Sequence, residues 1–131
     1  MRRADWQERF AAFAKERAEM PFAWGTNDCC TFAAGAVLAI TGKDPMASFE
    51  PYDSPLAAAR LVETGGGLSV LACSLLGPSV PPLMAAVGDV VLLTNEGREL
   101  LGVCNGPGAL APGKDGAVIV EMTAALAAWK I

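Results

Sequence analysis

The segment from Cys29 to Thr41 restricts the possible folds of this chain more than any other feature. Its sequence, CCTFAAGAVLAIT, carries no charge and is apolar around almost the whole helical circumference. A helix of this kind is stable only when other elements cover it, so we expect it at the centre of the domain. Asp28 or Asn27 can cap the free amides of its first turn, and Gly42 supplies a left-handed stop.

Three further helices are predicted in the first half of the chain. Residues 4–20 form an amphipathic pattern in which Trp6, Phe10 and Phe13 recur at helical spacing, and we interpret this aromatic stripe as core packing. Ser54 followed by Pro55 is typical of a helix start, here running to about residue 63. Residues 68–76 form a short apolar helix.

The second half of the chain has the composition of strands. Residues 90–93 are a buried strand by their β-branched and apolar run, and residues 100–105 and 117–121 are two more. The last residues, through Trp129 and Ile131, are a candidate closing strand. We interpret the Gly- and Pro-rich stretch 106–113 as a loop. Helices followed by an antiparallel sheet predict an α+β fold.

The length of 131 residues predicts one domain, residues 1–131. Within it we distinguish an N-terminal helix (1–21), a helical half (22–77) and a sheet half (88–131). The net charge is −4 and the basic residues are scattered, so binding to nucleic acid is not expected. No secretory signal and no apolar stretch of about 18 residues is present, which predicts synthesis in the bacterial cytoplasm without a signal peptide or membrane span.

Four cysteines and no histidine limit the chemistry of the chain. Because no Cys-x-x-Cys pair and no imidazole are available, neither a zinc site nor another cofactor is expected. Cys30, Cys73 and Cys104 are interpreted as small core residues. Cys29 differs, because a thiol at a helix N-terminus meets free amides and partial positive charge that lower its pKa.

Three motifs resemble those of NlpC-type cell-wall cysteine peptidases, which have a papain-like fold. The run from Trp24 to Phe32 resembles their Gly-x-Asp-Cys-Ser-Gly-Phe signature, residues 88–93 resemble Gly-Asp-Leu-Val-Phe-Phe, and residues 100–106 resemble His-Val-Gly-Ile-Tyr-x-Gly. Together with Thr41–Pro45, they resemble a small phage- and prophage-associated group related to NlpC proteins. The resemblance implies a single NlpC-like domain whose motif positions are Trp24, Gly25, Asp28, Gly88, Asp89 and Gly102.

The resemblance also implies that Cys29 occupies the position of the nucleophile and Leu100 that of the catalytic histidine. A cysteine without a general base is a poor hydrolytic catalyst. Asp28, Asp89, Glu99 and Glu121 are the carboxylates near the motifs, but an ordinary carboxylate is a weak base for a thiol. We interpret Asp28 as a helix cap and Asp89 as a turn residue, and Trp24 as a loop anchor, with a place in a ligand groove as its alternative.

The leading hypothesis is therefore an inactive NlpC-like pseudo-peptidase, a structural component of a phage tail tip or baseplate. Its implied partners are hub and baseplate proteins, and its expected location is the virion tail. The alternative is a peptidoglycan amidase or endopeptidase that uses Cys29 as nucleophile, binds peptidoglycan peptides and takes its base from a partner subunit. A third hypothesis is a cytosolic assembly chaperone.

Overall fold

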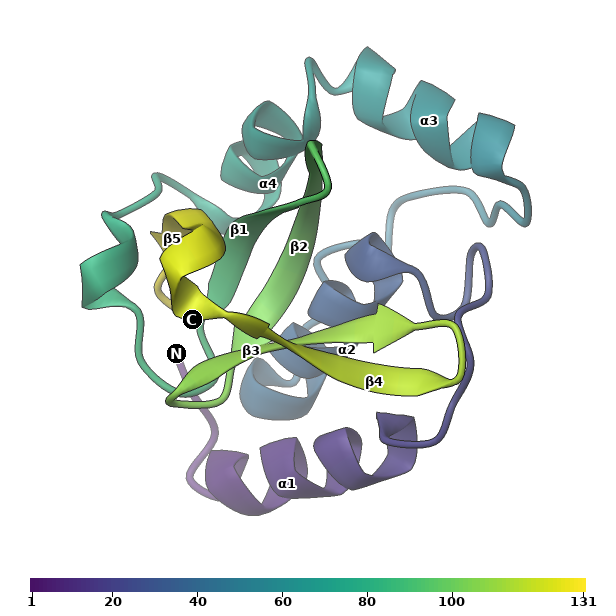
Figure 1. Cartoon of the computed structure of the whole chain (residues 1–131). Coiled ribbons are helices and arrows are strands. Elements are labelled where there is room, and N and C mark those ends of the chain that lie inside the picture. Colours follow the sequence, from purple (N-terminus) through teal and green to yellow (C-terminus); the bar gives the residue numbers. More distant parts are fainter.

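The computed structural model describes residues 1–131 and has an α+β architecture of four α-helices and a five-stranded antiparallel sheet (Figure 1). The helices are α1 (Trp6–Arg17), α2 (Cys29–Thr41), α3 (Pro55–Thr64) and α4 (Leu68–Leu76). The strands are β1 (Val90–Asn95), β2 (Arg98–Cys104), β3 (Gly108–Gly113), β4 (Gly116–Glu121) and β5 (Ala125–Trp129), with 3₁₀ turns at Pro82–Met84 and Met122–Ala124. Helix α2 packs on the sheet, α1 packs against α2, and α3 packs against α4. The α+β prediction is confirmed.

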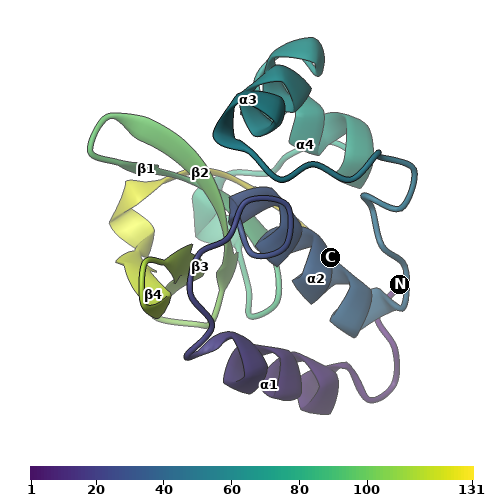
Figure 2. The ribbon, with the colours of Figure 1, turned by 90° about the vertical axis from the view of Figure 1, so that its right-hand side faces the viewer.

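Helix α2 is the central element, as its apolar sequence predicts. Figure 2 shows it enclosed by α1, by α3 and α4, and by the sheet. Its bounds match the predicted Cys29–Thr41, Asp28 caps its first turn, and Gly42 ends it at a φ of 80°. Phe32 and Ile40 of α2 are fully buried between the surrounding elements. The helix therefore provides a fixed platform for whatever lies at its N-terminus.

Helix α1 is shorter than the predicted span of residues 4–20 at both ends, because it begins at Trp6 and ends at Arg17. The predicted core role of its aromatic stripe is confirmed for Phe10 and Phe13, which are buried. The rings of Phe13 and Phe32 meet edge to face at 5.1 Å between centroids, a favourable aromatic arrangement. This contact attaches α1 to α2.

The sheet has the strand order β4-β3-β2-β1-β5, so the closing strand β5 pairs with the first strand β1. The interpretation of residues 106–113 as a loop is wrong for Gly108–Gly113, which forms β3 and pairs along its length with β4. Pairing outweighs the weak intrinsic strand preference of this Gly- and Pro-containing segment. A side chain at Gly102 would come within 2.8 Å of the Leu110 carbonyl, so the crossing of β3 over β2 requires glycine there.

Asp89 does more than the predicted turn residue. It is fully buried immediately before β1 and forms a 3.0 Å ion pair with Arg2 and a second pair with Lys130. Its carboxylate also accepts hydrogen bonds from the backbone N–H groups of Ala86 and Ile131. These contacts hold the two ends of the chain close together (Figure 1). We call this group the Asp89 cluster.

No single helix is both long and apolar enough to cross a bilayer, although α3 and α4 together reach that length and composition across a 68° bend. No group of three or more His, Cys, Asp or Glu side chains is arranged to hold a metal ion.

Candidate functional site

Cys29 lies in an open groove of about 450 Å³ between the N-terminus of α2, helix α3 and the beginning of β2. We call it the Cys29 groove. Its lining residues are Trp24, Asp28, Cys29, Cys30, Tyr52, Pro55, Ala58, Ala59, Val62, Glu63, Gly67, Leu68 and Glu99. The volume is within the range of about 300–1,000 Å³ that is usual for ligand sites. Of the residues expected from the motifs, the groove brings together Trp24, Asp28 and Cys29.

Asp28 organises one end of this groove. Its carboxylate accepts hydrogen bonds from the N–H of Thr31 at 2.9 Å, the N–H of Gly25 at 2.8 Å and the hydroxyl of Tyr52 at 2.6 Å. The Thr31 hydroxyl in turn accepts from the Asp28 N–H, which completes a capping box. Asp28 is only 2% exposed. These donors occupy the carboxylate, which supports the interpretation of Asp28 as a cap.

The loop before α2 is fixed by a close backbone approach. Gly25 has a φ of 83°, and a side chain on it would overlap the Tyr52 carbonyl, so only glycine fits. Trp24 packs edge to face on Phe22 with centroids 4.7 Å apart, and it remains 40% exposed. Trp24 is therefore both anchored in the loop and part of the groove wall.

The two adjacent thiols differ in acidity. The pKa of Cys29 is lowered, first because the Cys30 thiol donates a hydrogen bond to its sulfur and also because the Leu101 backbone N–H does so. Burial and the nearby Asp28 carboxylate act in the opposite direction. The pKa of Cys30 is raised by its interaction with Cys29 and by burial. Cys29 is thus the thiol of the pair that ionises more readily, in agreement with its position at a helix N-terminus.

The structure corrects the expectation for Leu100. Leu100 packs with Val91 and Leu93 on the face of the sheet away from α2, so a histidine at this position would not face Cys29. Side chains alternate between the two faces of a strand. In β2 the neighbouring Leu101 packs with the α2 cluster, and Glu99 lines the groove.

The other predicted residues lie outside the groove. Asp89 and Gly88 belong to the turn before β1, where Gly88 has a φ of 92° and lies close to Ile40 and Arg2. Glu121 ends β4, and Gly102 lies under β3. Neither Asp89 nor Glu121 lines the groove, so neither lies where a base for Cys29 would be needed.

Sequence reasoning missed Tyr52 and Glu63 as groove residues. The pKa of Tyr52 is raised by burial and by its hydrogen bond to the Asp28 carboxylate, so this phenol remains a neutral donor. Glu63 lies near the end of α3 and lines the opposite side of the groove. Neither residue belongs to a recognisable motif, because both come to line the groove only through the packing of the segment after α2.

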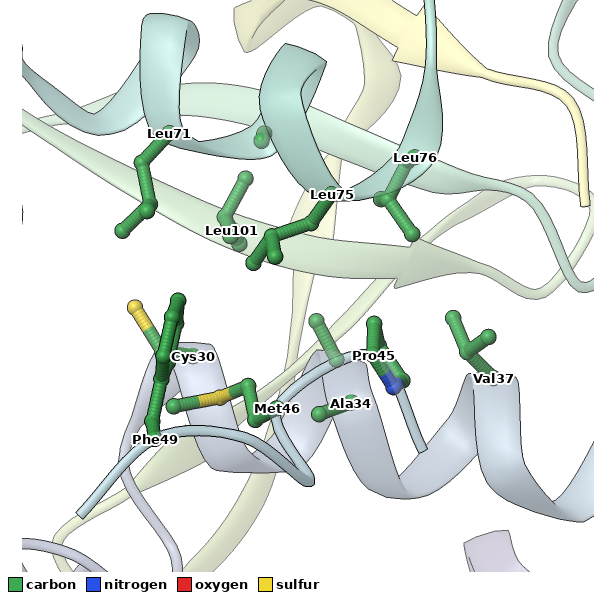
Figure 3. Close-up of a pocket in the computed structure, with 12 residues that line it drawn as sticks. Cys30, Ala34, Val37, Pro45, Met46, Phe49, Leu71, Leu75, Leu76 and Leu101 are labelled. Carbon is green, nitrogen blue, oxygen red and sulfur yellow. The ribbon is translucent and has the colours of Figure 1, made fainter. Parts of the chain in front are cut away.

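A second, smaller cavity of about 30 Å³ lies behind Cys30, between α2, α4 and the segment 45–49 (Figure 3). Its lining is apolar except for the Cys30 thiol, with Met46 and Phe49 on one side and Leu71 and Leu75 on the other. Cys73 packs against the neighbouring core cluster, and Cys104 is buried on the other side of the sheet. Such an apolar void adds no group that could act on the Cys29 thiol.

The sequence matches the model of a family described as a domain of unknown function, DUF6950, over residues 1–131. The chain belongs to the DUF6950 family. No curated protein matches the sequence. What the groove of this DUF6950 protein can do therefore follows from the chemistry of its lining residues.

The groove combines one thiol of lowered pKa with amide donors, a phenol and carboxylates. The groove of the DUF6950 protein supplies a nucleophile with a lowered pKa and amide donors at the N-terminus of α2. Its other ionisable side chains are the carboxylates of Asp28, Glu63 and Glu99, together with Cys30 and Tyr52, whose pKa values are raised. None of these groups is suited to accept the thiol proton and return it to a leaving amine at neutral pH.

Proposed function

We propose that this protein is a non-catalytic, NlpC-like structural component of a phage tail tip or baseplate, which uses the shape and surface of the domain to dock on neighbouring tail proteins. The observation that carries the proposal is the composition of the Cys29 groove. It has a thiol at the start of a buried central helix and no imidazole or other suitable base beside it.

The arrangement of α2 and β2 supports a relationship to papain-like peptidases. In those enzymes, a cysteine begins a central helix and its base faces it from an adjacent strand. Cys29 begins α2, and β2 contributes the Leu101 backbone and Glu99 on the side facing Cys29. The position of Cys29 at the start of α2 is what the first motif leads one to expect, whereas the third motif departs from the family pattern because Leu100 faces away from α2 and no base is present.

The charge of the groove supports the loss of activity. Glu63 and Glu99 add negative charge around the thiol, and Asp28 opposes ionisation of Cys29. A peptidase site of this type instead stabilises the thiolate through an adjacent imidazolium. The placement in a phage tail is supported by the resemblance of the motifs to those of phage-associated NlpC relatives.

Two measurements test the proposal. Purified, intact particles of the phage or prophage that encodes this chain should contain it in stoichiometric amounts by quantitative mass spectrometry. The isolated protein should show no turnover of muropeptides above background at neutral pH, and Cys29→Ala should give the same result. Its absence from intact particles would contradict the structural role and favour an assembly factor.

The control for the activity assay is an active NlpC-type peptidase in the same buffer, with circular dichroism showing that both forms of this protein are folded. Turnover that disappears in Cys29→Ala would establish the enzyme hypothesis. Turnover that occurs only after addition of a tail protein would indicate that the partner supplies the base.

A further inference from the structure

We propose that the Cys29 groove is the docking site for a lysine-bearing segment of a partner protein, whose side-chain ammonium lies against Glu63 and Glu99. This inference rests on the proposed non-catalytic function and specifies the chemistry of the partner. Three properties of the groove support it, namely its uncompensated charge, its apolar and aromatic walls, and its unsuitability for acidic peptides.

The groove carries negative charge that the chain itself does not neutralise. Three carboxylates line it, those of Asp28, Glu63 and Glu99, and no lysine or arginine does. Neither Glu63 nor Glu99 takes part in any ion pair. Arg60 belongs to the same helix as Glu63 but lines a different pocket. A cation brought by a partner would supply the missing complementary charge.

The walls of the groove suit a long aliphatic side chain that ends in a cation. Apolar residues from Pro55 to Leu68 form one wall, and Trp24 and Tyr52 expose aromatic surface near it. The methylene groups of lysine pack on apolar surface while the ammonium stays at a polar edge. Ring faces also attract cations, with tryptophan the most effective. The contact of Trp24 with Phe22 holds this ring in place before any partner binds.

The same charge disfavours cell-wall peptides as ligands. Peptidoglycan stem peptides carry free carboxylates close to the amine of their diamino acid, and these carboxylates would lie beside Glu63, Glu99 and Asp28 in this groove. Like charges placed together at an interface oppose binding. A protein segment can present a lysine without an accompanying carboxylate, so we assign the groove to a protein partner.

The first experiment compares two capped tripeptides that differ only in the ammonium group. The ¹⁵N-labelled full-length protein is titrated with acetyl-Ala-Lys-Ala-amide and with its norleucine analogue, and binding is followed by NMR. We expect saturable shifts at the Trp24 indole and at the Gly25 and Cys29 amides. The norleucine peptide should bind about five-fold more weakly, as loss of one ion pair and one cation–π contact implies.

The second experiment removes the charge of the groove. The double variant Glu63→Gln/Glu99→Gln changes exposed side chains, so its fold should be retained. It should bind the lysine peptide no more tightly than the norleucine peptide. The matched control Glu8→Gln/Glu19→Gln removes two exposed carboxylates that do not line the groove, and it should bind the lysine peptide like the unmodified protein.

The proposal is overturned if the lysine peptide does not bind, if both peptides bind equally, or if the control variant loses as much affinity as the groove variant. Tighter binding of a carboxylate-rich stem tripeptide would also overturn it and would assign the groove to the cell wall. Turnover dependent on Cys29 would refute the proposed function instead. The two failures are therefore distinguishable, since one is measured by binding and the other by bond cleavage.

Discussion

The two buried aspartates of this protein, Asp28 and Asp89, have similar exposure but different partners. Asp28 is 2% exposed, and its carboxylate is satisfied by backbone N–H groups and by hydroxyls, with no cation in contact. Asp89 is fully buried and forms ion pairs with Arg2 and Lys130. The difference lies in whether the negative charge is neutralised within the chain.

The two aspartates therefore have different roles. Asp89 holds the fold together, whereas Asp28 borders the groove that we propose binds a partner. At Asp89, both cations come from the ends of the chain, so the charge serves to hold the termini on the sheet. At Asp28, hydrogen bonds fix the loop and the first turn of α2, while the negative charge remains next to the Cys29 groove. A buried carboxylate is tolerated when hydrogen bonds satisfy it, as they do at Asp28. The charge that a partner would meet in the groove is therefore that of Glu63 and Glu99.

The largest effect is expected at the Asp89 cluster. Asp89→Ala removes the partner of Arg2 and Lys130 and leaves the Ala86 and Ile131 N–H groups without their acceptor. We expect a loss of about 3 kcal/mol in the free energy of unfolding, because a fully buried carboxylate loses two charge-assisted backbone hydrogen bonds and two ion pairs with partly exposed cations. Urea unfolding followed by circular dichroism measures it.

Asp5→Ala is the matched control, because it removes an aspartate that pairs with Arg9 on the exposed surface. Its unfolding curve should nearly superimpose on that of the unmodified protein. Similar losses for the two variants would show that Asp89 is an ordinary surface carboxylate in energetic terms, and the comparison with Asp28 would then have no basis.

The contrast between the aspartates also marks the limit of sequence-based prediction. The cap at Asp28 is readable because its main partner, Thr31, is three residues away and both lie at the start of an apolar run. The partners of Asp89 are 87 and 41 residues away along the chain, at Arg2 and Lys130. No local pattern encodes contacts that form only when both ends of the chain meet the sheet.

The incorrect predictions for β3 and for the groove residues have the same cause, namely contacts between segments that are distant in the sequence. Strand β3 lacks strong strand-forming residues and depends on pairing with β4, so its local composition resembles a loop. Motif spacing assigns Leu100 to the position of the catalytic histidine, but strand alternation turns it away from α2. Tyr52 and Glu63 reach the groove through tertiary packing of the segment after α2.

The second-largest effect is expected at the Asp28 cap. Asp28→Ala removes the capping box and the acceptor of the Gly25 and Tyr52 hydrogen bonds. We expect a loss of about 2 kcal/mol in the free energy of unfolding, from a lost cap and unpaired donors. Tyr52→Phe should cost about 1 kcal/mol. Asp53→Ala, at an exposed neighbouring position, is the control and should change little.

We expect a larger loss of stability for Asp89→Ala than for Asp28→Ala, because the charge of Asp89 is paired with cations whereas that of Asp28 is held by neutral donors. If Asp28→Ala destabilises the protein more than Asp89→Ala in the same urea titration, the cap would be the principal anchor of the fold. The assignment of Asp89 as the dominant electrostatic contact would then be wrong.

A smaller effect is expected from pH. Although burial alone would raise it, the Lys130 ammonium and the N–H groups of Ile131 and Ala86 hold the pKa of Asp89 below its ordinary value. A carboxyl with a lowered folded-state pKa stabilises the protein above its unfolded pKa, about 3.9. This stabilisation is lost as pH falls through the folded-state pKa. Urea midpoints measured from about pH 6 to pH 2.5 should therefore fall less steeply for Asp89→Asn than for the unmodified protein, and parallel profiles would contradict the role of this carboxylate.

The smallest effect is expected in the reactivity of Cys29, and it tests the uncompensated charge directly. Neutral iodoacetamide and anionic iodoacetate alkylate the same thiolate, so the ratio of their rates reports the local potential. The acidic lining should slow iodoacetate selectively. In Glu63→Gln/Glu99→Gln the iodoacetate-to-iodoacetamide ratio should rise about three-fold at low salt, as removal of like charges several ångströms away implies. Added salt should reduce the difference between the variant and the unmodified protein.

Because Cys29 and Cys30 are adjacent, tandem mass spectrometry must assign the alkylated sulfur. Cys29 should react first, since the pKa of its thiol is lowered and that of Cys30 is raised. Glu8→Gln/Glu19→Gln lowers the net negative charge of the chain equally and should leave the ratio unchanged. An equal rise in both double variants would mean that the ratio follows net charge rather than the lining of the groove. The proposed difference between Asp89, whose charge is neutralised within the chain, and the Cys29 groove, whose charge is not, would then be wrong. That difference requires a negative local potential at Cys29.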